Sequence, residues 1–187
     1  MKTEKDSGVL SRKKPALFFR YISKMKGGKR TALFAAPKPF DLMISFGGVM
    51  IGVTLIVWLS GKYDLLVVAS FGASAVLVFG IPDAPMAQPR NVILGNIFSA
   101  ASGVAVAGVF GLTWWSPALG AALALMVMLL TKTAHPPGGA VALHAVMYQD
   151  TVSFVFWPMG AGAIILVVIG LLVNNLSPNR RYPKYWL

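Results

Sequence analysis

Residues 132–139 read Lys-Thr-Ala-His-Pro-Pro-Gly-Gly and contain the side chains of this chain best suited to binding an anion. The two prolines have a fixed φ and no N–H, which suits the first turn of a helix, and the two glycines allow close approach of a ligand. A helix that starts here directs free N–H groups and a partial charge of about +0.5 toward one point, where the lysine and histidine would add positive charge. The predicted anion-binding residues are Lys132, His135, Pro136, Pro137, Gly138 and Gly139.

Two further stretches could contribute to such a site. Residues 69–75 combine small residues with two hydroxyls at an expected helix break, and their candidate members are Ser70, Gly72 and Ser74. Residues 81–91 hold three prolines and a cation, Arg90, although pairing of Arg90 with Asp83 in an interfacial loop explains them equally well. For 132–139 the alternative is a Pro-Pro-Gly loop whose lysine extends toward the membrane surface. His135 could also carry a proton near neutral pH.

Catalytic chemistry is poorly provided for. His135 and His144 are nine residues apart, which would place them on opposite faces of a helix and excludes a metal site on one helix. Residues 42–175 contain three acids, each near an expected segment end, so a pair of carboxylates for acid–base or metal chemistry is missing. Cysteine is absent. We therefore expect no enzyme, no metal and no cofactor.

Composition indicates a membrane protein. The chain is 56% hydrophobic and 12% charged, against roughly one-quarter charged residues in soluble domains. Of its net charge of +11, +8 lies in residues 1–41, whereas residues 42–175 hold three bases and three acids. Basic flanks around a nearly neutral apolar body argue against binding of nucleic acid and favour contact with an anionic lipid leaflet.

The elements that must position the candidate residues follow from the charge-free runs, since a membrane-spanning helix needs about 20 apolar residues. The longest run must turn once, at residues 113–117, where paired tryptophans precede a proline. We therefore expect an all-α, polytopic membrane protein with six helical segments. The expected segments are about 42–60, 64–80, 91–112, 117–132, 136–148 and 153–175.

Two of these segments are short for a bilayer. Residues 117–132 and 137–148 would extend roughly 24 Å and 18 Å, against a hydrocarbon thickness of about 30 Å. The break at 131–139 would then lie below the membrane surface, where non-helical backbone is tolerated only next to protein or a water-filled cavity. Four full spans with two re-entrant segments fit the sequence as well as six crossings do. Similar interruptions in two three-segment halves also fit an inverted repeat.

Small residues recur every fourth position along the third segment. They are Gly95, Ser99, Gly103, Ala107 and Gly111. Such a stripe lets helix backbones pack closely, either within one chain or across a homo-oligomer. Gly48 and Gly52 of the first segment are candidates for the complementary surface.

The flanks define the remaining organisation. Residues 1–40 are expected to be a basic cytoplasmic arm with an interfacial amphipathic helix over 15–26, although a merely solvated arm fits too. Residues 41–176 form the transmembrane domain, and residues 177–187 form a basic cytoplasmic tail. Because segments rich in Lys and Arg tend to stay on the cytoplasmic side of a membrane, we expect both termini in the cytoplasm. The expected location is a bacterial inner membrane, which a multi-pass protein would span, and an organellar membrane is the alternative.

Several motifs together resemble those of the HPP family of integral membrane proteins, which is named after its His-Pro-Pro motif. The similar stretches are residues 70–77, Phe79-Gly80, residues 82–91 (PDAPMAQPRN) and residues 134–140. The resemblance covers about residues 38–175. It implies a four-spanning protein, whereas we count six segments, and it implies nitrite transport, in which cyanobacterial and plastid members are implicated.

These observations favour a transporter or channel for a small monovalent anion, with nitrite as the first candidate. The anion would bind near residues 135–139 and 70–74, attracted by Lys132 or Arg90. The alternative is a non-transporting membrane scaffold or assembly subunit, which the small-residue stripe would serve. The expected partners are a small inorganic anion, the lipid bilayer and further copies of the chain in a homo-oligomer.

Overall fold

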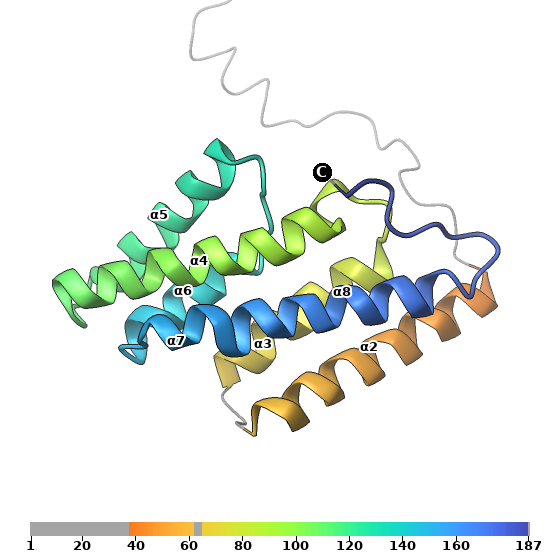
Figure 1. The fold of residues 1–187 in the computed structure, drawn as a ribbon, viewed down its shortest axis with the longest axis horizontal. Helices are drawn as coiled ribbons and strands as arrows, with labels where there is room; N and C mark the ends of the chain where they lie inside the picture. The colour runs from red at the N-terminus through yellow and green to blue at the C-terminus, as the bar shows by residue number, and fades with distance from the viewer. Residues whose placement is uncertain (1–37, 62–64, 187) are drawn as a thin grey trace, which may run out of the picture. The chain divides into compact units, whose positions relative to one another are not determined.

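The computed structural model describes residues 38–61 and 65–186 (Figure 1). Within these residues every regular element is helical. The α-helices are α2 (Pro39–Ser60), α3 (Leu65–Ala75), α4 (Pro89–Phe110), α5 (Ser116–Leu130), α6 (Gly138–Met147), α7 (Val152–Phe154) and α8 (Ala161–Asn174). Single turns of other helix types are η1 (Val76–Gly80), η2 (Pro85–Ala87) and η3 (Val155–Gly160).

The six predicted segments are confirmed, with α3 and η1 forming the second segment and α7, η3 and α8 the sixth. α2 and α4 begin two or three residues earlier than expected because Pro39 and Pro89 occupy their first turns, where proline is favoured. At their other ends Gly61 and Gly111 adopt positive φ angles of 60° and 62°, which glycine tolerates best. The predicted amphipathic helix over 15–26 lies outside the described residues.

Three helical segments in the described part are long and apolar enough to cross a membrane. They are 39–59, 89–110 and 152–174, of 21, 22 and 23 residues. α5 and α6 are shorter, as predicted, with 15 and 10 residues. The all-helical fold of a membrane protein is therefore confirmed.

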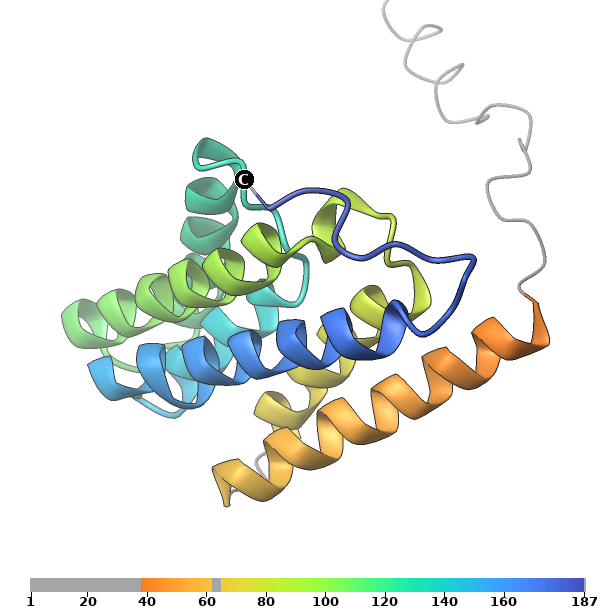
Figure 2. The ribbon, with the colours of Figure 1, turned by 45° about the vertical axis from the view of Figure 1, so that its right-hand side comes forward.

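The helices form two groups that share a core. α4 packs against α5 and α6, whereas α2 lies at one edge of the bundle against α8 and α3 (Figure 2). The largest core side chains include Phe71, Phe79, Met159 and Leu166. α2 is the least enclosed of the three long segments: 17% of its most apolar 18-residue stretch is buried, against 50% in the other two segments. Its outer face therefore suits contact with lipid.

The small-residue stripe of α4 makes its close contact inside this chain. A methyl group added at Gly103 would lie 2.6 Å from both the carbonyl oxygen of Ala142 and Cβ of Ala145, so α4 and α6 approach closely there. Gly48 and Gly52 are not its complement, contrary to expectation. They face Phe79, a bulky side chain that α2 accommodates only through these glycines.

Candidate site at the break between α5 and α6

The segment that joins α5 to α6 runs back into the bundle beside α4. Arg90 donates a hydrogen bond to the carbonyl of Thr131 (3.0 Å), and Asn91 donates one to the carbonyl of Ala134 (2.9 Å). Farther along α4, a methyl group at Gly95 would lie 2.6 Å from Cβ of His135. Successive residues of the segment thus contact successive turns of α4, moving away from its start.

α6 consequently begins beside the middle of α4. A Cβ on Gly138 would overlap the hydroxyl of Ser99, and Ser99 is the eleventh of the 22 residues of α4. At about 1.5 Å per residue, Gly138 lies about 15 Å along the α4 axis from Pro89. α4 is long enough to cross a membrane, and the non-helical residues 133–137 reach the level of its middle. Of these residues, Thr133, His135 and Pro137 are buried, whereas Pro136 is exposed.

His135 is the central side chain of this segment. It is 1% exposed, and both ring nitrogens are engaged: Nδ1 lies 2.9 Å from the carbonyl oxygen of Met86, and Nε2 lies 2.8 Å from the hydroxyl of Ser74. Because a carbonyl oxygen only accepts, Nδ1 must carry a hydrogen. His135 therefore connects the loop before α4 with the end of α3.

The start of α6 differs from expectation in its hydrogen bonding. The N–H groups of Gly138, Gly139 and Ala140 donate to carbonyls three residues earlier, at 2.9, 3.1 and 3.1 Å. Pro136 and Pro137, which precede them, have no N–H to offer. The prediction of free backbone donors at this helix start is therefore wrong. The end of the helix dipole and the imidazole remain as sources of positive potential.

Comparison with known proteins identifies the family. The model of the transmembrane region of HPP proteins matches residues 35–183 of this chain. The chain belongs to the HPP family. Its His-Pro-Pro motif is the residue triplet 135–137 that leads into α6.

Two similar relatives are named as transmembrane proteins of Dictyostelium discoideum. One is 36% identical over 197 aligned residues, which cover 100% of this chain and 63% of the relative. The other is 42% identical over 129 residues, which cover 65% of this chain and 45% of the relative. The HPP chain thus spans less than two-thirds of the length of either relative. No solved structure matches it.

The remaining predicted site residues of this HPP protein divide into those near His135 and those elsewhere. Ser70 and Ser74 are buried, and the Ser74 hydroxyl lies 2.9 Å from the Ser70 carbonyl as well as near His135. Lys132 adopts a positive φ of 57° at the end of α5, and its side chain is exposed, so it lies outside the buried cluster. The placements of the others are Arg90 half-buried, Pro136 exposed, Pro137 and Gly138 buried, and Gly72 and Gly139 half-buried.

Open space borders two of the glycines. A Cβ built on Gly72 or on Gly139 meets no heavy atom within 4 Å. Each belongs to a helix that starts or ends near His135, so added side chains there would enter free volume rather than displace a neighbour. In the HPP structure these positions are where bulk can be added without disturbing the packing.

One residue of the site, Met86, and one buried polar residue of α4, Asn96, were not predicted. Met86 contributes a backbone carbonyl, which leaves no signature in residue type. Asn96 is 1% exposed, donates to the carbonyl of Val92 (2.7 Å), and has no partner for its side-chain oxygen among the described residues. An asparagine inside an apolar helix was the signal that could have identified Asn96, because such groups are costly in a membrane.

A second histidine lies in the last turns of α6. Nδ1 of His144 is 2.7 Å from a carboxylate oxygen of Asp150, and its ring stacks on Tyr148 and Phe154 with centroid distances of 4.4 and 4.8 Å. In the described part of this HPP protein, no three His, Cys, Asp or Glu residues lie close enough to hold a metal.

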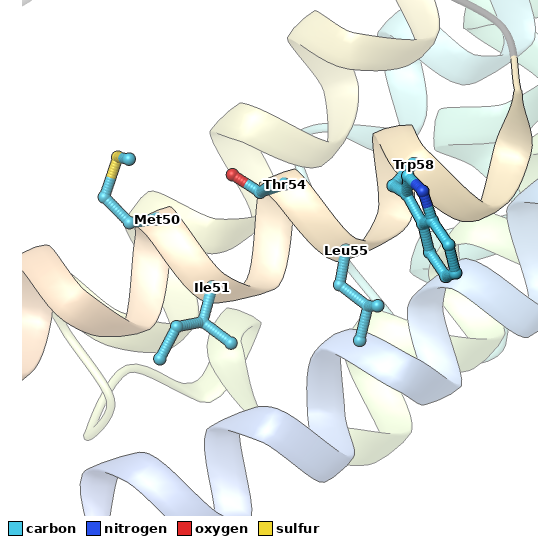
Figure 3. Close-up of a pocket in the computed structure, with 5 residues that line it drawn as sticks. All are labelled: Met50, Ile51, Thr54, Leu55 and Trp58. Atoms are coloured by element: carbon cyan, nitrogen blue, oxygen red, sulfur yellow. The ribbon is translucent and has the colours of Figure 1, made fainter.

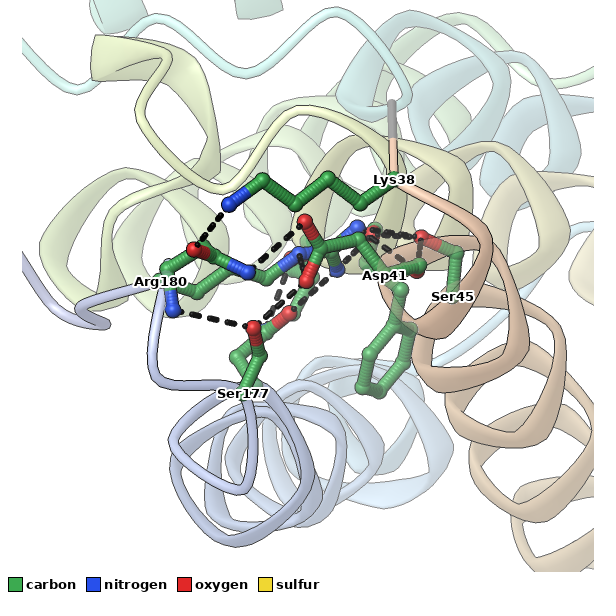
Figure 4. A network of polar contacts seen from close by, with 9 residues as sticks. Lys38, Asp41, Ser45, Ser177 and Arg180 are labelled. Carbon is green, nitrogen blue, oxygen red and sulfur yellow. Dashed lines mark hydrogen bonds and ion pairs between the residues drawn. The ribbon is translucent and has the colours of Figure 1, made fainter.

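The basic tail of the HPP chain is tied to the helix ends. Arg180 donates to the carbonyls of Asp41 (2.8 Å) and Phe79 (2.9 Å), and Ser177 donates to the Asp41 carboxylate (2.5 Å; Figure 4). The Tyr182 hydroxyl donates to the carbonyl of Ala87 (2.8 Å), and burial raises the pKa of this phenol. The start of α2, the end of η1 and the residues after α8 therefore meet at one end of the bundle.

α2 carries an apolar groove. Its lining residues are Met50, Ile51, Thr54, Leu55 and Trp58 (Figure 3). None of them belongs to the cluster around His135. An apolar groove on the outer face of a membrane-spanning helix fits contact with lipid tails.

Proposed function

We propose that this HPP protein moves a small monovalent anion, nitrite being the first candidate, across a membrane by way of the region around His135. The observation that carries the proposal is the buried break beside the middle of α4. There a histidine, a hydroxyl and the positive end of α6 lie together, enclosed by apolar helices. A polar break at this depth is typical of transporters, whose binding sites lie near the bilayer midplane.

Charge supports the same function. In residues 65–175 the cations are Arg90 and Lys132, and both belong to the end of the bundle where α4 begins and α5 ends. They would raise the local concentration of anions at the mouth of the site. The small-residue stripe of α4, which favoured a scaffold, is accounted for by packing against α6 within the chain. No second function is therefore argued.

Flux into proteoliposomes that contain only this protein tests the proposal. We expect nitrite to enter faster than into protein-free liposomes. Gly139→Leu should reduce that flux strongly, because it fills the open volume beside the start of α6. Gly108→Leu is the matched control, since Gly108 on α4 also has no heavy atom within 4 Å of a built Cβ and lies outside the cluster.

Two flux results would contradict the proposal. Equal flux in liposomes with and without the protein, for nitrite, nitrate and chloride, would refute anion transport. Wild-type flux in Gly139→Leu would remove this region from the path.

A further inference from the structure

His135 and Ser74 share a hydrogen bond whose direction depends on one proton. Because Nδ1 donates to the Met86 carbonyl, a neutral His135 has a bare Nε2 that can only accept. The Ser74 hydroxyl has one hydrogen and two acceptors in reach, Nε2 at 2.8 Å and the Ser70 carbonyl at 2.9 Å. In the neutral state the hydroxyl must therefore point to Nε2.

Addition of a proton to Nε2 reverses this bond. The new N–H donates to the Ser74 oxygen, and the hydroxyl rotates to donate to the Ser70 carbonyl. No bond within Ser74 breaks, because the proton comes from water and stays on the imidazole. Both charge states of His135 thus keep two hydrogen-bonded ring nitrogens, so neither state leaves a buried ring nitrogen unpaired.

A charged His135 would nevertheless lack a counter-charge. The surrounding elements are α3, η2, α4, residues 131–137 and α6. Their charged or titratable side chains are Arg90, which binds the Thr131 carbonyl, Lys132, which is exposed, and His144, which pairs with Asp150. None of these is an acid.

The described acids are all engaged elsewhere. Asp41 binds Ser177 and Arg180, Asp83 lies 3.0 Å from Lys184, and Asp150 holds His144. An unpaired buried charge is costly, so an imidazolium at position 135 requires a negative charge that the described residues do not supply. The transported anion would supply it.

We infer that His135 takes up one proton when the anion binds, so that proton and anion occupy the site as a neutral pair, with Ser74 as the residue that positions the imidazole in both states. The inference rests on the proposed function and names its coupling ion. By linkage, anion binding must strengthen proton binding as much as protonation strengthens anion binding.

Nitrate binding to the purified full chain in detergent tests the inference. Nitrate is the anion of a strong acid, so protons taken up on binding enter the protein and not the ligand. Above the pH at which free His135 titrates, nitrate affinity should rise about tenfold for each unit by which the pH is lowered, with one proton taken up per nitrate bound.

Two serine variants separate positioning from packing. Ser74→Ala removes the acceptor for the charged ring, so nitrate affinity at acidic pH should fall about five- to tenfold and proton uptake should decrease. Ser102→Ala is the matched control, because it removes another buried helical hydroxyl, one that donates to the carbonyl of Phe98 (2.7 Å) and belongs to none of the predicted site stretches. It should bind nitrate with wild-type pH dependence.

Nitrogen NMR of ¹⁵N-histidine-labelled protein gives an independent readout. The chain has two histidines, so His135→Gln assigns the signals. Without anion, His135 should be neutral with hydrogen on Nδ1, and saturating nitrate should protonate both nitrogens. This spectrum also reports whether Ser74→Ala remains folded.

Each result bears on the inference. Nitrate binding without proton uptake overturns it and leaves anion transport standing. Unchanged pH dependence in Ser74→Ala overturns the role of the hydroxyl. If neither nitrate nor nitrite binds or is transported, the inference and the proposed function fail together.

Discussion

Gly103→Ala tests the close contact between the middle of α4 and α6. The added methyl would lie 2.6 Å from the carbonyl oxygen of Ala142 and from Cβ of Ala145, so α4 and α6 must separate by about 0.8 Å to reach the 3.4 Å of an ordinary contact. One of the two atoms is backbone and cannot rotate away. Overpacking of this kind costs about 1–3 kcal/mol, and a backbone clash belongs at the upper end of that range.

The separation would also affect α5. Gly120 of α5 lies beside this contact: a Cβ built on Gly120 would be 3.7 Å from Cα of Gly103. Three helices, α4, α5 and α6, therefore meet at this point. Alanine has a higher helix propensity than glycine, which stabilises the variant by up to about 1 kcal/mol and offsets part of this cost. We therefore expect a net loss of about 2 kcal/mol in the free energy of unfolding.

The measurement is unfolding in detergent followed by tryptophan fluorescence. Gly108→Ala is the control, because it has the same propensity gain on the same helix and no neighbour to displace. It should be as stable as the wild type or up to about 1 kcal/mol more stable. If Gly103→Ala matches Gly108→Ala, the close approach of α4 and α6 is not a constraint and the reasoning is wrong.

Further predictions concern the tail and the topology. Arg180→Leu should lower stability by about 3 kcal/mol, since it removes several hydrogen bonds from a charged group, whereas Arg181→Leu, at an exposed position, should have little effect in the same unfolding assay. The raised pKa of buried Tyr182 means that its contribution to stability is complete below about pH 10 and is lost as the pH rises through the higher folded-state value. Tyr182→Phe should abolish this alkaline loss, and tyrosinate absorbance that appears at the ordinary pH in the folded protein would contradict it. Reporter fusions at both ends should give cytoplasmic signals, and opposite signals would exclude an even number of crossings.

Much of the fold was predictable because the bilayer constrains helix length. Runs without charge located all six segments, and the proline at 117 was expected to lie in the first turn of the fourth, as it does in α5. The starts of α2 and α4 were placed two or three residues late, because the expected ranges left out Pro39 and Pro89, which lie in their first turns. The shortness of α5 and α6 followed from the same arithmetic. These features depend on residues close together in the chain, so pattern and spacing suffice to infer them.

Features that depend on distant residues were not predictable. The acceptor for Nδ1 of His135 is a carbonyl 49 residues away, and any residue type at position 86 offers the same oxygen. The hydrogen bonds that occupy the N–H groups at the start of α6 depend on how tightly residues 135–137 turn. The role of Arg180 was missed because a cation in a basic tail looks the same whether it is solvated or buried at a helix end.

The bond between Arg180 and Asp41 has a consequence for biosynthesis. The two residues are 139 positions apart, and Arg180 is made after every helix described. While the ribosome is still working, α2 must enter the membrane with Asp41 lacking both Arg180 and Ser177. Until those residues emerge, the acid must stay in the headgroup region or be sheltered by the insertion machinery. A ribosome that stalls before codon 177 would leave α2 inserted and α8 complete, but the ends of the two helices unjoined.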